Sequence, residues 1–156
     1  MKKIAIFPGS FDPFTIGHEE IVKRGLSMFD TIIVAIGKNS SKKTMHSLEK
    51  RMELINKVFA DEPRIEVDTY EGLTINYCQS KGAKFLLRGL RTAADFEYER
   101  AIAQMNKNLD HEIESVFLLT APEHTPVCST IVRDIFNNEG DISAFLPTNI
   151  NMDDLK

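Results

Sequence analysis

The sequence has few of the features that mark membrane, secreted or metal-binding proteins. Only two of the 156 residues are cysteines, Cys78 and Cys128, and they lack the paired spacing of zinc or redox sites. We therefore expect reduced thiols, a cytoplasmic location and no metal held by the protein itself. No apolar run approaches the roughly 20 residues that cross a bilayer. The run that starts at Ile4 stops at Pro8, which predicts a first strand rather than a signal peptide.

The chain also lacks an excess of positive charge, internal repeats and linker-like segments. A formal net charge of -4 argues against broad electrostatic binding to nucleic acid or to an anionic membrane. With 42% hydrophobic residues, the chain has enough apolar surface for one core, so we predict a single domain over residues 1–156. Residues 149–156 are polar, and we expect them to be mobile or to dock on a neighbour. Any phosphate site must be built locally.

Short β-branched runs alternate with amphipathic stretches of helical length. This pattern predicts an α/β fold, namely a Rossmann-like open sheet of five parallel strands with helices on both faces. The predicted strands are residues 3–7, 31–36, 65–68, 84–87 and 115–119. The predicted helices are residues 17–28, 48–59, 74–80, 93–109 and 130–137. Ser47 is expected to cap a helix start, and Gly82 and Gly140 are expected to cap helix ends.

Polar residues follow the predicted strands closely. In open parallel sheets, ligands bind beyond the carboxyl ends of the strands, where loops and helix N-termini converge. The residues in these positions are Ser10, His18, Lys42, Thr74, Arg88, Arg91, Ser129 and Thr130. Together they offer hydrogen-bond donors and positive charges to a phosphate chain. The sequence therefore predicts a phosphate-binding site on one rim of the sheet.

The segment between the first strand and the first helix carries the most specific motif. Alone, Pro and Gly after a strand usually mark an ordinary turn, and a lone His is more often structural. Here GSFDP at residues 9–13 is followed by TIGH at residues 15–18. This combination resembles the signature of the nucleotidyltransferases related to class I aminoacyl-tRNA synthetases.

A second block narrows the resemblance. RGLR at residues 88–91 and ADFEYE at residues 94–99 resemble the corresponding block of the bacterial phosphopantetheine adenylyltransferase family, and the similarity covers essentially the whole chain. The resemblance implies an enzyme of coenzyme A biosynthesis. It would transfer the adenylyl group of ATP reversibly to 4′-phosphopantetheine by direct in-line attack, giving dephospho-coenzyme A and pyrophosphate. It also implies Mg²⁺ bound with ATP, feedback inhibition by coenzyme A, and a homohexamer.

The resemblance assigns roles to individual residues. His18 is expected to stabilise the transition state at the α-phosphate of ATP. The residues expected to bind the acceptor are Ser10, Lys42, Thr74 and Arg88. The residues expected to bind ATP are Ser10, Phe11, His18, Gly89, Leu90, Arg91, Glu99, His124, Thr125, Pro126, Val127, Cys128, Ser129 and Thr130. The sequence departs from the family pattern at Cys128, which stands in a usual serine run, and at His124, where an aromatic residue is common.

Simpler interpretations remain open from the sequence alone. Lys42 and Lys43 could form a solvated patch, while Arg88 and Arg91 could pair with Asp95 and Glu97 at the surface. Two other functions are also compatible with the fold. One is a nucleotidyltransferase acting on nicotinamide mononucleotide or glycerol 3-phosphate, against which the block at residues 88–99 weighs. The other is a non-catalytic RNA-binding or regulatory module, against which the acidic net charge and the intact set of phosphate-handling residues weigh.

Overall fold

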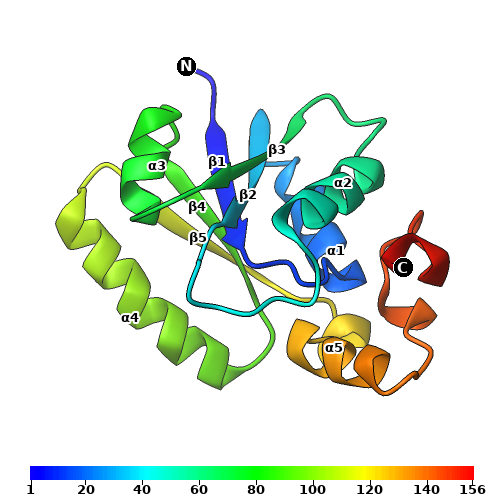
Figure 1. Ribbon diagram of the computed structural model, residues 1–156. Helices are drawn as coiled ribbons and strands as arrows, with labels where there is room; N and C mark the ends of the chain where they lie inside the picture. Colours follow the sequence, from blue (N-terminus) through cyan, green and yellow to red (C-terminus); the bar gives the residue numbers. More distant parts are fainter.

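A computed structural model describes all residues 1–156 and contains one five-stranded parallel sheet (Figure 1). The strands are β1 (Ile4–Gly9), β2 (Thr31–Gly37), β3 (Ile65–Tyr70), β4 (Phe85–Leu90) and β5 (Glu114–Leu119). Their order across the sheet is β3-β2-β1-β4-β5, and every neighbouring pair is parallel. The direction of winding reverses between β1 and β4. A ligand site is expected beyond the carboxyl ends of these two strands.

Helices cover both faces of the sheet, because successive strand residues point to opposite sides. Phe7 of β1 and Val34 of β2 share a core with α1 (Ile16–Gly25) and α2 (Leu48–Val58). The alternate residues Ile6 and Ile33 pack instead with α3 (Thr74–Ser80), and α4 (Ala93–Leu109) runs beside β5 (Figure 1). The last helix, α5 (Ser129–Asn137), follows β5. The predicted fold class and all ten predicted elements are confirmed.

Two of the three expected helix caps form as predicted, and the third, at the end of α5, differs. The Ser47 hydroxyl accepts from the Lys50 N–H at 3.1 Å, and Gly82 takes a left-handed φ of +64° just after α3. After α5, however, Glu139 takes the left-handed conformation, with φ +63°. The N–H of Gly140 bonds to the carbonyl of Ile135 at 2.8 Å, and a Cβ at Gly140 would clash with that residue's side chain. Glycine is therefore needed at residue 140 because its backbone lies close to Ile135, and not because it forms a left-handed turn.

The C-terminal residues 149–156, expected to be mobile or to dock on a neighbour, pack against the body of the same chain. Leu155 is buried in a cluster with Leu54 of α2 and Val132 of α5. Lys57 donates to the Asp154 carboxylate at 2.7 Å, and the ring of His46 bonds to the carbonyl of Leu155 at 2.9 Å. The tail therefore lies against α2 and the segment that precedes it.

Two other expectations concern cysteine and membranes. Cys78 is buried in α3 and Cys128 lies just before α5, and both thiols are free. None of the helices combines the length and the apolar character that spanning a membrane requires.

Candidate active site

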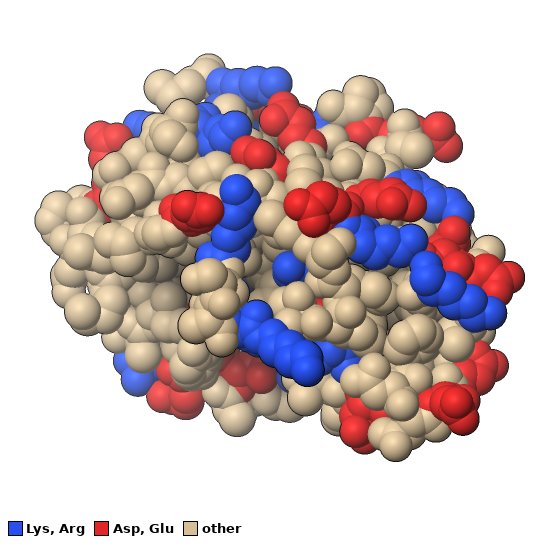
Figure 2. Space-filling model, viewed as in Figure 1, with Lys and Arg blue, Asp and Glu red and all other residues tan.

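Two adjoining hollows lie beyond the carboxyl ends of β1 and β4. We call the hollow that His18 lines the inner hollow, of about 340 Å³, and the one that Thr74 lines the outer hollow, of about 420 Å³. Residues Pro8, Gly9, Ser10 and Arg88 line both. Lys and Arg side chains gather in and around the hollowed centre of the face in Figure 2. The inner hollow is lined by the cationic Lys42, Arg88, Arg91 and Arg133 and by one carboxylate, that of Asp12, so positive charge predominates there although the chain as a whole is acidic.

Most of the predicted site residues meet in these hollows. Those in the inner hollow are Ser10, Phe11, His18, Lys42, Arg88, Gly89, Arg91, His124, Val127, Cys128, Ser129 and Thr130. Thr74 and Glu99 join Ser10 and Arg88 around the outer hollow. Leu90, Thr125 and Pro126 line neither hollow. Leu90 is buried at the end of β4, and the Thr125 hydroxyl bonds to the carbonyl of Ala121.

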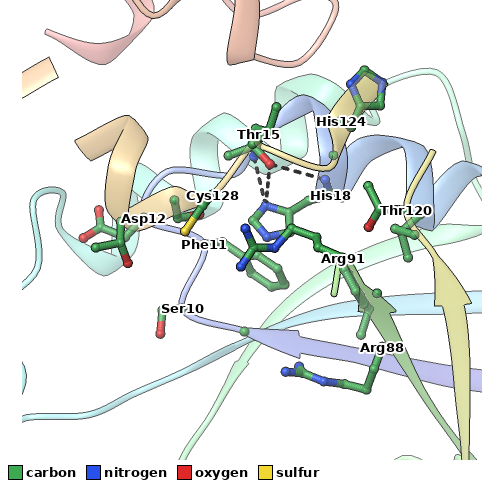
Figure 3. A pocket seen from close by; sticks show the side chains of 18 of the residues that line it. Ser10, Phe11, Asp12, Thr15, His18, Arg88, Arg91, Thr120, His124 and Cys128 are labelled. Carbon is green, nitrogen blue, oxygen red and sulfur yellow. Dashed lines mark hydrogen bonds between the residues drawn. The ribbon is translucent and has the colours of Figure 1, made fainter. Parts of the chain in front are cut away.

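His18 is fixed by the first turn of α1. The Thr15 N–H donates to His18 Nδ1 at 3.0 Å, while the Thr15 hydroxyl caps the helix by accepting from the His18 N–H (Figure 3). Burial, followed by the charges of Arg88 and Arg91, lowers the pKa of His18 to about 4. The ring is therefore neutral near pH 7. Because Nδ1 accepts a hydrogen bond, the proton sits on Nε2 and makes that atom a donor.

Aromatic rings pack around this imidazole. The ring centroids of Phe11 and Phe14 lie 5.1 and 5.2 Å from that of His18, and Phe7 lies 6.2 Å away. Phe11 has a left-handed φ of +49°, which is unfavourable for a bulky side chain and persists only where the surroundings hold it. A Cβ on Gly9 would collide with the Phe11 ring at 2.7 Å. Glycine at residue 9 thus admits the ring that supports His18.

Both predicted arginines have carboxylate partners. Arg88 bonds to Glu99 through Nη2 at 2.6 Å and Nε at 2.9 Å, and its Nη1 donates to the carbonyl of Pro8 at 2.6 Å. Arg91 lies 3.5 Å from Asp95, as the surface-pair interpretation suggested. Glu97 pairs with Arg100 instead. Since a guanidinium has five N–H donors, Arg88 keeps donors for a further anion while Glu99 holds its orientation.

Lys42 approaches the same point from an exposed loop. Its ammonium lies 3.5 Å from the Ser10 hydroxyl, and its neighbour Lys43 is exposed and lines neither hollow. The end of the loop is tied down, because Asp12 accepts from the N–H groups of Met45 at 2.7 Å and His46 at 3.0 Å. The loop is therefore anchored after Lys42, whose own side chain is exposed.

The segment before α5 forms the opposite wall of the inner hollow. Cys128 occupies the N-cap position of α5. Burial raises the pKa of the Cys128 thiol, but the N–H groups of Ile131 and Thr130 and the charge of Arg91 outweigh this effect, so the pKa lies below its ordinary value. The Ser129 hydroxyl donates to the carbonyl of Pro13 at 2.9 Å. Ser129 therefore ties this wall to the loop after β1.

The sequence analysis missed several residues of the site. Thr120 lines the inner hollow directly after β5, so the search for polar residues at strand ends could have found it. Arg133 lines the same hollow from α5, whereas Arg51 reaches the loop after β1 from α2. Arginines inside amphipathic helices look like solvated residues, so the sequence carries no signal for these two. Nowhere in the protein do three or more His, Cys, Asp or Glu side chains gather as a metal site would require.

Comparison with known proteins gives a consistent result. A family model described as Cytidylyltransferase-like matches residues 6–135. A protein named phosphopantetheine adenylyltransferase from Flavobacterium psychrophilum is 54% identical over 143 residues, covering 92% of this chain and 94% of the relative. The chain belongs to the phosphopantetheine adenylyltransferase family. A relative of the same name from Phocaeicola vulgatus is 50% identical over 149 residues, covering 96% and 98% of the two chains.

Solved structures agree on the architecture. A bifunctional NMN adenylyltransferase/ADP ribose pyrophosphatase from Francisella tularensis superposes with a TM-score of 0.75 at 16% sequence identity. The match covers 96% of this chain and 46% of that one. At this identity the likeness concerns the fold alone. The phosphopantetheine adenylyltransferase family thus shares its nucleotidyltransferase fold with proteins that are distant in sequence.

Proposed function

We propose that this chain is a pantetheine-phosphate adenylyltransferase of coenzyme A biosynthesis. It transfers the adenylyl group of ATP to 4′-phosphopantetheine and yields dephospho-coenzyme A and pyrophosphate. The observation that carries the proposal is the meeting of two hollows at Ser10 and Arg88, with His18 on the wall of one of them. Two substrates in adjoining hollows would bring a phosphate of each to this shared wall. The family membership supports the same reaction.

The acceptor phosphate needs no base to attack. A phosphate monoester has a second pKa of about 6, so it is largely a dianion at neutral pH. One of its oxygens attacks the α-phosphorus of ATP and forms a new P–O bond, while the opposite P–O bond breaks and its electrons leave with pyrophosphate. One phosphoanhydride replaces another, so the step is reversible. The barrier is repulsion between anions, which cations and fixed dipoles can offset.

The residues of the inner hollow supply these cations and dipoles. The neutral His18 donates from Nε2 to an α-phosphate oxygen, where negative charge develops in the transition state. Arg91 and Gly89 face the ATP phosphates, and the rest of the nucleotide wall is formed by His124, Val127, Cys128, Ser129 and Thr130. A neutral donor is suited to this role, because it gives up no proton and remains in the same state throughout the transfer.

The outer hollow accommodates the acceptor. Lys42 and Arg88 hold its phosphate beside Ser10, at the boundary with the inner hollow. The rest of the outer hollow combines apolar side chains such as Ile102 and Phe117 with the polar Thr74 and Asn106. This mixture suits the pantetheine arm, an alternation of short apolar units and amides. Nicotinamide mononucleotide and glycerol 3-phosphate, the acceptors of the rival interpretation, carry no such arm.

Mg²⁺ enters with ATP in this proposal. The lining of the inner hollow contains one carboxylate, that of Asp12, and its two oxygens already accept backbone N–H groups. The protein therefore offers no oxygen cage for a resident ion. Mg²⁺ fits instead as part of the MgATP substrate, held by phosphate oxygens and water as is common for this ion. When bound, it neutralises part of the charge on the phosphates.

The remaining parts of the proposal concern assembly and regulation. We infer a homohexamer, in keeping with the family resemblance and with the unburied apolar side chains of α4. None of the α4 residues is buried, and Tyr98, Met105 and Leu109 are 70%, 63% and 58% exposed. Light scattering of the purified protein measures the assembly.

Coenzyme A acts as a feedback inhibitor in this proposal, and a titration of the enzyme's activity with coenzyme A tests this. The proposed location is the cytoplasm, and the two free thiols fit its reducing conditions.

An acceptor screen tests the reaction. Purified protein, MgATP and one acceptor at a time, chosen from phosphopantetheine, nicotinamide mononucleotide and glycerol 3-phosphate, are followed by pyrophosphate release and product mass, with CTP controls. Product from phosphopantetheine alone is the expected result. Turnover of another acceptor would contradict the assignment of the outer hollow. No turnover would favour the non-catalytic RNA-binding interpretation, which a melting-temperature rise with RNA but not with ATP would support.

A further inference from the structure

The end of β1 and the loop that joins it to α1 are held by their carbonyl groups. Four carbonyl oxygens of this segment accept a hydrogen bond from a side chain that belongs to β4, α2 or α5. The pairs, carbonyl first, are Pro8–Arg88 at 2.6 Å, Ser10–Arg51 at 2.7 Å, Asp12–Arg133 at 2.8 Å and Pro13–Ser129 at 2.9 Å. The backbone of the reaction centre is therefore fixed from three sides.

Arg51 is the unusual member of this set. It lies in α2, is only 6% exposed, and both of its hydrogen-bond acceptors are backbone carbonyls, those of Ser10 and Ser47. A buried charge is costly unless an opposite charge compensates it. Arg88, by contrast, has Glu99 as a partner. The positive charge of Arg51 thus remains uncompensated by a carboxylate, directly behind the backbone at Ser10.

The peptide group between Ser10 and Phe11 connects this charge to the site. The only cis peptide bond is Asp12–Pro13, so the Ser10–Phe11 unit is trans and its C=O and N–H point in opposite directions. The C=O points to Arg51, so the N–H of Phe11 points away from it. This N–H has no acceptor within the protein. Phe11 lines the inner hollow, where an anion could accept that hydrogen bond.

We propose that Arg51 is a positioning residue for adenylyl transfer. Its guanidinium holds the Ser10–Phe11 peptide so that the Phe11 N–H is aimed at the α-phosphate, and it makes this N–H a stronger donor by polarising the peptide. The inference rests on the proposed function. A fixed N–H directed at developing negative charge stabilises the transition state more than the ground state. Arg51 also holds the carbonyl just before Phe11, whose left-handed conformation would otherwise relax.

Kinetics of two Arg51 variants test the proposal. Arg51→Met removes the donors and the charge, and Arg51→Lys keeps the charge with a different geometry. Arg64→Met is the matched control, because Arg64 is exposed and lies outside both hollows. The number of ATP-binding sites is measured by equilibrium binding, and kcat is calculated per site. Unfolded molecules are thereby left out of the enzyme concentration. We expect kcat to fall about tenfold or more in Arg51→Met, the scale of losing a charge-assisted hydrogen bond, and by less in Arg51→Lys.

Other outcomes are decisive as well. A kcat per binding site within about twofold of wild type in Arg51→Met would overturn the proposal, because a structural role alone changes the number of sites and leaves each one intact. If Arg51→Met does not fold, Arg51→Lys is judged by the same criterion. If neither variant binds ATP, Arg51 is a structural residue and the proposal fails.

A spectroscopic measurement separates this proposal from the proposed function. In protein labelled with ¹⁵N-phenylalanine, the amide resonance of Phe11 should shift in Arg51→Met or Arg51→Lys and stay in place in Arg64→Met. An unshifted resonance would overturn the positioning role whatever the enzyme's reaction. If the wild-type enzyme formed no dephospho-coenzyme A in the acceptor screen, the proposed function would be refuted. The shift of the Phe11 resonance would still report on the positioning by Arg51.

Discussion

The loops after β1 and β2 both reach the shared wall of the two hollows, yet they are held very differently. Residues 11–15 of the first loop are buried, and side chains from other elements bind its carbonyl groups. Residues 38–43 of the second loop are exposed, and the Lys42 ammonium makes a single long contact with Ser10. The difference suggests a division of labour. The first loop fixes the point of reaction, while the second can adapt as the acceptor phosphate arrives.

The largest expected effect comes from removing the donor that α1 places directly after the fixed loop. His18→Ala should lower kcat by on the order of a hundredfold or more, with little change in ATP affinity, because the donor acts mainly in the transition state. Steady-state kinetics and equilibrium ATP binding measure the two quantities. His111→Ala, in an exposed turn far along the chain, serves as the control and should retain wild-type rates. Equal losses of binding and rate in His18→Ala would contradict the assigned role.

A smaller effect of a different kind is expected in the exposed loop. Lys42→Ala should raise the KM for phosphopantetheine by about ten- to a hundredfold and leave that for ATP nearly unchanged, since one charged contact to the acceptor is lost. Lys43→Ala is a control on the neighbouring residue and should change neither KM. If Lys42→Ala instead lowered kcat as strongly as His18→Ala, the distinction between a fixed loop and an adaptable loop would disappear.

A third prediction concerns Cys128, in the wall of the inner hollow that precedes α5, compared with Cys78, which is buried in α3. Burial raises the pKa of the Cys78 thiol to about 11, whereas that of Cys128 is lowered. Iodoacetamide at pH 8 should therefore alkylate Cys128 in preference to Cys78, because the thiolate is the reactive form. Saturating MgATP should slow the labelling of Cys128 several-fold, as peptide mass spectrometry can follow. If phosphopantetheine protected Cys128 from labelling and ATP did not, the assignment of the two hollows to the two substrates would have to be reversed.

The smallest expected effect concerns stability against acid. The pKa of His18 is about 4 in the folded protein, below the ordinary value of 6.5 that applies when the chain unfolds. Between these values the unfolded chain binds more protons, so the free energy of unfolding falls as the pH is lowered from about 6.5 to about 4. His18→Asn should lose less stability over this range than wild type, as denaturant titrations can measure. Parallel curves for the two proteins would mean that His18 is not a buried neutral ring.

The sequence predicted the fold well because its signals are local. β-Branched runs and amphipathic periods determine the ten elements, and the rule for the ends of parallel strands brought His18, Lys42 and Arg88 to one rim. The same reasoning failed for Arg51 and Arg133. Both lie inside helices, and their importance arises from carbonyl groups 41 and 121 residues away along the chain. Local patterns contain no information about such pairs.

Conformation also explains the one change among the helix ends. A glycine near the end of a helix usually indicates a left-handed residue, which made Gly140 the expected cap. Glu139 adopts that conformation instead, and Gly140 is needed because the side chain of Ile135 leaves no room for a Cβ there. The choice between the two roles depends on packing, which the sequence pattern alone does not describe.

The wall that the two hollows share has a consequence for the end of the catalytic cycle. Dephospho-coenzyme A joins an adenosine part and a pantetheine part in one molecule, so under the proposed assignment of the hollows it would occupy both at once. When one part detaches, the other keeps it at a high effective concentration, so that linkage strengthens binding beyond either part alone. The product is therefore a bivalent ligand of its own enzyme. It leaves only when its adenosine part and its pantetheine part are dissociated at the same time.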